Sequence, residues 1–248
     1  MTVINDHVFN RRKFSIIVGC NGHPIIYSPE SPSESDRYSP FSVFSLEDLQ
    51  KVKKKQLRIE EITWTGQQLS ASDFDTLQYI NQVGNCCVLH VDSESSTSED
   101  KKRFAERIIN ISFSEITLDY PYEALLRHQA HSKVIKRLVL TGSGWSNEVQ
   151  PVIEKILLTH PIKFASICRS FVLENDFLEK LFDVPCLSSK KKSFHIKILN
   201  ESFERFCDFR PNLQIEKSDN KVIWERDDGV QVSIVRLYDG ITLFKFLN

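Results

Sequence analysis

Residues 87–118 read CVLHVDSESSTSEDKKRFAERIINISFSEITL, a stretch that holds a strand pattern, a helix pattern and a second strand pattern in turn. Cys87–Val91 and Glu115–Leu118 are short apolar runs of the strand type. Between them, Ser98-Glu99-Asp100 opens a helix in which apolar residues recur every three to four positions, and the acidic residues stand at the end that the helix dipole favours. The stretch therefore predicts a strand–helix–strand unit.

The same unit recurs along much of the chain. Helical patterns such as Val149–Leu157, which His160-Pro161 terminates, alternate with further strand-type runs. The apolar markers of the successive strands are separated by 26, 28, 22, 29 and 29 positions, and they are Ile62, Val88, Ile116, Leu138, Ile167 and Ile196.

This period is typical of solenoids that resemble leucine-rich repeats, in which stacked units form a parallel sheet on one side and a row of helices on the other. The asparagine ladder of such repeats is missing, so the units would be degenerate. A doubly wound sheet would give the same alternation of strands and helices. The short and nearly constant period favours the degenerate leucine-rich-repeat-like stack, and we expect an α/β fold of that kind.

Both ends of the chain carry antiparallel patterns. Phe14–Cys20 and Pro24–Tyr27 predict a hairpin, because Asn21-Gly22 supplies the positive φ that a tight turn requires. From Asn212 the chain alternates strands and turns, which predicts an antiparallel β-meander. We therefore expect a hairpin with a Ser/Pro-rich loop over 1–50, strand–helix repeats over 51–210 and a C-terminal β cap over 211–248, joined in one continuous structural unit.

Composition and charge narrow the class of protein. The 248 residues are 41% hydrophobic and 26% charged, which fits a soluble globular protein and neither a disordered nor a membrane-spanning one. Lys and Arg number 32 against 33 Asp and Glu, a balance that argues against nucleic acid or an acidic membrane as partner. Six scattered cysteines without a signal-peptide pattern predict free thiols in the cytoplasm. The basic runs 53–55 and 190–192 resemble nuclear-import signals, so the nucleus is an alternative location.

No motif in the sequence establishes catalysis, a cofactor or a metal site. His128 and His131 stand three apart on an expected helix, but no nearby ligand completes a metal site. Gly142-Ser143-Gly144 follows a strand and lacks the Lys-Ser/Thr ending of a phosphate loop. Asp227-Asp228 precedes a glycine in a hairpin turn, where backbone geometry accounts for it. We expect no enzymatic activity, no cofactor and no metal.

What remains is a surface for recognition. In a stack of strands and helices, alternate strand residues point away from the helices and form a polar face of mixed charge. The residues expected there, and assigned to protein binding, are Thr63, Glu115, Thr117, Asp119, Arg137, Val139, His195 and Lys197.

The chain also resembles the nematode F-box-associated proteins. The similarity rests on the hairpin over 13–28, on Leu138-Val139-Leu140-Thr141-Gly142-Ser143-Gly144-Trp145, and on residues 223–234, whose Arg226-Asp227-Asp228-Gly229 is close to that family's Arg-x-Asp-Gly turn between two strands. The resemblance covers most of the chain from about Lys13. It implies the substrate-binding part of an F-box ubiquitin-ligase receptor, with a Skp1-type adaptor and a cullin as further partners.

The sequence departs from that family at its N-terminus. Only residues 1–12 precede the hairpin, and no Leu-Pro-rich helical start of an F-box is visible in them. The expected function is therefore a non-enzymatic protein–protein interaction module of unidentified partner. The alternatives are an α/β enzyme with an unrecognised active site and a free-standing decoy that competes for the same substrates.

Overall fold

The computed structural model divides the chain into two compact units, Met1–Ser132 and Lys133–Asn248, each considered by itself below. The residues that it describes are 12–20, 22–28, 42–54, 57–83, 86–93, 95–142, 144–167, 175–183, 192–197, 203–204, 208–237 and 241–247. Within these ranges, no helix combines the length and the apolar character that crossing a membrane requires.

The first unit is a mixed sheet with helices. Its elements in chain order are β1 (Arg12–Val18), β2 (Ile25–Ser28), β3 (Ser42–Phe44), α2 (Leu46–Lys51), β4 (Leu57–Trp64), α3 (Ala71–Val83), β5 (Cys86–Val91), α4 (Ser98–Ile108), β6 (Glu115–Leu118) and α5 (Glu123–Ser132). The strands stand in the order β3-β2-β1-β4-β5-β6. β1 and β2 pair antiparallel, as the predicted hairpin requires, while β4 pairs parallel with β1 and with β5.

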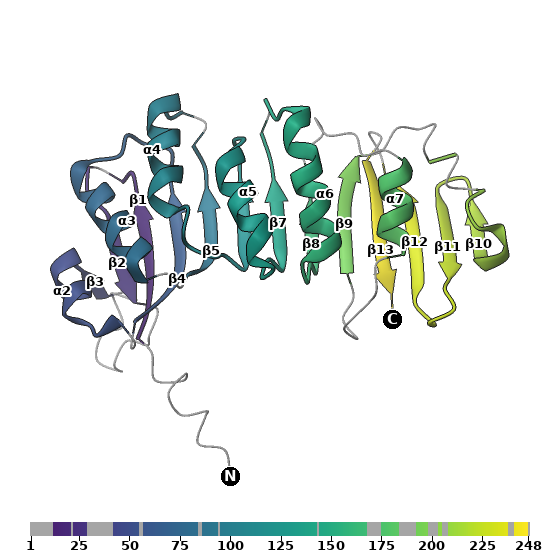
Figure 1. The fold of residues 1–248 in the computed structure, drawn as a ribbon, viewed down its shortest axis with the longest axis horizontal. Coiled ribbons are helices and arrows are strands. Elements are labelled where there is room, and N and C mark those ends of the chain that lie inside the picture. Colours follow the sequence, from purple (N-terminus) through teal and green to yellow (C-terminus); the bar gives the residue numbers. More distant parts are fainter. Residues whose placement is uncertain are drawn as a thin grey trace, which may run out of the picture. The chain divides into compact units, whose positions relative to one another are not determined.

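The parallel strands of this unit advance across the sheet in one direction. From β1 to β4, β5 and β6, each strand lies beside the one before it, and a crossover connection that contains a helix joins them. Such crossovers are right-handed in nearly all proteins, so connections that step in the same direction carry their helices to the same face. Accordingly, α2 to α5 all lie on one face of this sheet (Figure 1).

The core of the first unit lies between that face and its helices. Trp64 at the end of β4 is fully buried, and its ring lies 4.7 Å from that of Phe104 on α4. Leu77 and Ile80 of α3 are likewise fully buried. Each such side chain stabilises the fold by roughly 1.5–3 kcal/mol when it leaves water, which is why the helices stay on the sheet.

Three helices of the first unit begin with the same polar motif, Ser/Thr-x-x-Asp. Ser45 and Asp48 form a reciprocal capping box at α2, in which each side chain bonds the other's backbone N–H. Ser70 and Asp73 do the same before α3, with distances of 2.8 and 3.1 Å. At α4 the N-cap is Thr97, whose hydroxyl accepts from the N–H of Asp100 at 3.1 Å. The motif satisfies backbone donors that a helix start leaves free.

The second unit is also a mixed sheet. Its elements are β7 (Arg137–Leu140), η2 (Asn147–Val149), α6 (Gln150–Thr159), β8 (Phe164–Ser166), α7 (Asn175–Phe182), β9 (Lys192–Lys197), η3 (Pro211–Leu213), β10 (Gln214–Ser218), β11 (Lys221–Glu225), β12 (Gln231–Arg236) and β13 (Ile241–Leu247). Strands β7, β8 and β9 are parallel neighbours. β10 to β13 form the predicted antiparallel meander, whose last strand pairs antiparallel with β9.

A cluster of aromatic rings and arginines joins α7 to the meander within the second unit. The indole N–H of the buried Trp224 donates to the carbonyl of Phe209 at 2.7 Å, and the Phe182 ring packs against both residues. Arg210 donates two hydrogen bonds of 2.7 Å to the carboxylate of Asp183 and stacks on the Phe182 ring. The meander is therefore anchored by the segment that precedes it as well as by its strand pairing.

The α/β class, the hairpin and the meander are confirmed, while β3 and α2 were not predicted. The divisions expected at residues 50 and 210 fall inside the two units. The Ser/Pro-rich loop lies largely outside the described residues.

Gly66 is the most constrained turn of the first unit. Its φ of +79° belongs to the left-handed region, and a Cβ there would lie 2.4 Å from the carbonyl oxygen of Asp92. The Gly66 carbonyl also accepts hydrogen bonds from the hydroxyls of Ser95 and Ser96, at 2.8 and 2.5 Å. The loop after β4 is thus fitted against the loop after β5, and only glycine suits both the dihedral angle and the space.

We predict that Gly66→Ala destabilises the protein by about 3 kcal/mol or more, because it adds a backbone clash to the cost of a left-handed alanine. Gly22→Ala is the matched control, since Gly22 has a φ of +85° with no atom within 4 Å of the added Cβ. It should cost only about 1–2 kcal/mol. Urea denaturation of both variants measures the difference, and equal losses would contradict the packing of these two loops.

Candidate functional site

The face of the first sheet opposite its helices carries two rows of aligned side chains. The first row crosses five strands, because strand register pairs Ile25 with Ile17, Ile17 with Thr63, Thr63 with His90, and His90 with Thr117. Neighbouring strands are about 4.8 Å apart, so the row is about 19 Å long. His90 is exposed and the other four side chains are half-buried.

The second row lies two residues away along the same five strands. Here register pairs Tyr27 with Ser15, Ser15 with Glu61, Glu61 with Val88, and Val88 with Glu115. Ser15 is buried between its larger neighbours, and the remaining side chains are half-buried. We call these ten residues the open face, since no helix of the described part of the first unit covers them.

The open face combines apolar side chains at one end with carboxylates near the other. Ile17, Ile25 and Tyr27 come from β1 and β2, whereas Glu61 and Glu115 flank Val88 on β4, β5 and β6. The hydroxyl of Thr63 donates to the Glu61 carboxylate at 3.2 Å.

Of the eight predicted binding residues, three belong to the open face: Thr63, Glu115 and Thr117. Asp119 lies just after β6, where its two carboxylate oxygens accept from the N–H of Ser93 at 2.5 Å and from the Ser93 hydroxyl at 2.9 Å. The Tyr122 hydroxyl donates to the same Ser93 oxygen at 2.7 Å. Asp119 thus joins the loops after β5 and β6, and both of its oxygens are engaged in the fold.

The other four predicted residues belong to the second unit. Arg137 is exposed on β7 and stacks on the ring of Phe164, its register partner on β8, at 4.5 Å. Val139 is half-buried beside Ser166. His195 and Lys197 lie within β9, but their side chains are outside the described part of the structure.

Sequence reasoning missed most of the open face, in part because two strand irregularities hide it. Val88 served as an apolar core marker, yet its side chain points outward and Leu89 points inward. In β4 the register with β1 slips after Phe14, so Glu60 and Glu61 are both half-buried. Such bulges re-aim the side chains that follow them. Ile17, Ile25 and Tyr27 could be added only once the hairpin was known to pair with β4.

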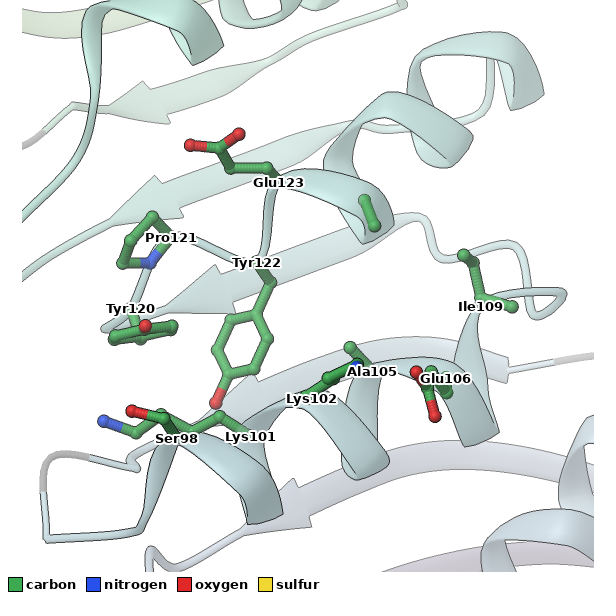
Figure 2. Close-up of a pocket in the computed structure, with 11 residues that line it drawn as sticks. Ser98, Lys101, Lys102, Ala105, Glu106, Ile109, Tyr120, Pro121, Tyr122 and Glu123 are labelled. Carbon is green, nitrogen blue, oxygen red and sulfur yellow. The ribbon is translucent and has the colours of Figure 1, made fainter.

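A second feature is a groove on the helix side of the first unit, between α4 and the β6–α5 connection (Figure 2). It has a volume of 280 Å³ and a mainly apolar lining. Its apolar wall is built from the side chains of Ala105 and Ile109 on α4 and of Tyr120, Pro121 and Tyr122 on the connection. Burial raises the pKa of Tyr122, so its hydroxyl stays protonated as the donor to Ser93.

The structure also shows where the histidines and acids of a possible enzyme lie. His90 and Asp92 are both exposed, and neither contributes to the groove. Asp119 is engaged by Ser93, as described above. In the first unit as described, His90 therefore does not join Asp92 or Asp119 in a closed cleft.

Comparison of the chain with protein families, with curated proteins and with solved structures finds no match in any of the three.

The adjacent Cys86 and Cys87 occupy opposite environments, which gives a direct test of the register of β5. Cys86 is buried, and burial raises the pKa of its thiol, whereas Cys87 is half-buried with its sulfur 3.2 Å from the Arg58 guanidinium. Because the thiolate is the reactive form, iodoacetamide at pH 8 should modify Cys87 at least about tenfold faster than Cys86. Peptide mass spectrometry of Cys86→Ala and Cys87→Ala variants separates the two rates, and faster labelling of Cys86 would contradict the register.

Proposed function

We propose that the chain is a non-enzymatic protein–protein interaction module whose first unit receives its partner on the open face. The observation that carries the proposal is the pair of side-chain rows across five strands, which the helices leave uncovered. A sheet face with apolar side chains at one end and polar side chains at the other offers both the buried contacts and the orienting charges of a protein interface.

The charges of the open face indicate the chemistry of the partner. Within the described residues, Glu115 makes no ion pair, and Glu61 receives only the Thr63 hydroxyl. A basic side chain of the partner would pair with these carboxylates, while its apolar side chains would cover Ile17, Ile25 and Val88. We therefore propose a protein partner with a basic residue beside an apolar patch.

The repeating strand–helix order supports a more specific proposal. Helices on one face of a sheet of sequential parallel strands suit a degenerate leucine-rich-repeat-like stack, whose free strand face is where such solenoids bind. Together with the sequence resemblance, this supports the substrate-binding part of an F-box ubiquitin-ligase receptor, working in the cytoplasm or the nucleus with a Skp1-type adaptor and a cullin. A free-standing decoy would use the same face, whereas an α/β enzyme would need a catalytic cleft instead.

Reversing one charge on the open face tests the proposal. We predict that Glu115→Arg weakens partner binding by at least about tenfold, because a like charge would then face the partner's basic residue. The matched control is Asp75→Arg, which makes the same change in net charge at an exposed position of α3 on the helix side. The measurement is quantitative affinity purification of tagged wild type and both variants, followed by titration of the captured partner.

Partners retained by the wild type and by Asp75→Arg but lost from Glu115→Arg would support the open face as the binding site. A Skp1-type adaptor and a cullin that remain with all three proteins would support the ligase role and place their contact elsewhere. Equal loss or equal retention of every partner by the two variants would overturn the assignment to the open face.

A further inference from the structure

The groove between α4 and the β6–α5 connection is lined at one end by Lys101, a cationic side chain with little exposure to water. Lys101 is only 8% exposed, and its ammonium nitrogen lies 4.2 Å from the centre of the Tyr120 ring (Figure 2). Among the described residues, no carboxylate forms an ion pair with it. A lysine ammonium has three N–H donors, and a cation–π contact leaves them able to bind an anion that enters the groove.

The position of Lys101 adds to this positive potential. It stands in the first turns of α4, where the helix dipole places partial positive charge, and the hydroxyl-bearing Ser98 lines the same end of the groove. A carboxylate at this end would meet the Lys101 ammonium and would lie near the Ser98 hydroxyl. Both features point to an anion at the N-terminal end of α4.

The remainder of the groove is suited to an apolar body. From Ser98 to Ile109 the lining follows α4 over about 16 Å, with Ala105 on one wall and Pro121 on the other. Its volume of 280 Å³ lies near the lower end of pockets that take small organic ligands, roughly 300 Å³ and above. At the far end the exposed Glu106 would repel a second negative charge.

We propose that this groove binds a small monocarboxylate with an apolar body, its carboxylate on Lys101 and its hydrocarbon between α4 and Pro121. The site goes beyond the proposed protein-binding function, since it lies on the helix side of the sheet and uses none of the open-face residues. Ligands with one carboxylate are selected over dicarboxylates because Glu106 would repel a second carboxylate that reaches its part of the groove.

Three eight-carbon probes test the site on the intact chain. Octanoate carries one carboxylate, suberate carries two, and 1-octanol carries none. We expect saturable octanoate binding with a Kd at or below about 1 mM by NMR titration, and suberate binding at least about tenfold weaker. Lys101→Met keeps the length and packing of the side chain while removing its charge, so it should weaken octanoate at least about tenfold and leave 1-octanol unchanged.

Glu106→Gln provides a second variant at an exposed position, so folding is not at risk. It should bring the affinity for suberate close to that for octanoate. Binding of octanoate and 1-octanol with equal affinity to the wild type, unchanged octanoate binding by a folded Lys101→Met protein, or absence of octanoate binding would overturn the proposal. A failure of the open-face experiment leaves these results unaffected, because the two sites share no residue.

Discussion

The handedness of crossover connections is the constraint on which the first unit depends. Four parallel strands follow one another across its sheet in chain order, so each right-handed connection carries its helix to the same side. Trp64, Leu77 and Phe104 are then buried on that side, while Thr63, His90 and Thr117 line up on the other. In the part of the unit that the structure describes, a sheet face without helices is thus a consequence of topology, and its composition determines what can bind there.

Hydrogen bonds between loops make this arrangement specific. After β4 the Gly66 carbonyl accepts from Ser95 and Ser96, and after β5 the backbone and hydroxyl of Ser93 donate to Asp119. At the opposite ends of the strands, the buried Gln129 of α5 accepts from the N–H of Phe113 and donates to the carbonyl of Ile111. The loops after β4, β5 and β6 are thus joined in sequence at one edge, and α5 is joined to the α4–β6 connection at the other. These bonds matter because an unpaired buried polar group costs about 1–3 kcal/mol.

The sequence predicted the elements well where the pattern is local. The apolar strand pattern located β6 to the residue, and the Asn21-Gly22 turn located the hairpin. It did not predict which strand the hairpin would join, since the pairing of β1 with β4 depends on contacts far apart in the chain. A second local signal is the motif Ser/Thr-x-x-Asp, which recurs at 45–48, 70–73 and 97–100 and marks the start of α2, α3 and α4.

The candidate sites were harder to predict, for physical reasons. Thr63, Glu115 and Thr117 follow from strand alternation, but the register slip between β1 and β4 and the interrupted burial alternation of β5 place Glu61 and Val88 on the outward side as well. Alternation along the strand predicts that the Asp119 side chain points outward. Its carboxylate instead accepts a hydrogen bond from Ser93, and this contact depends on how two loops meet. The groove at Lys101 combines residues of α4 with Tyr120 and Pro121, so no sequence window contains it.

The central claim is that helices cover one face of the first sheet and leave the opposite face in contact with water. Methyl NMR with a soluble gadolinium chelate tests it most directly, since the chelate broadens only signals that it can approach. The account predicts strong broadening of the Thr63, Val88 and Thr117 methyl signals, while those of Ile62, Leu89 and Ile116, all fully buried, stay sharp. Equal protection of both sets would show that the proposed binding face is covered and would contradict the account.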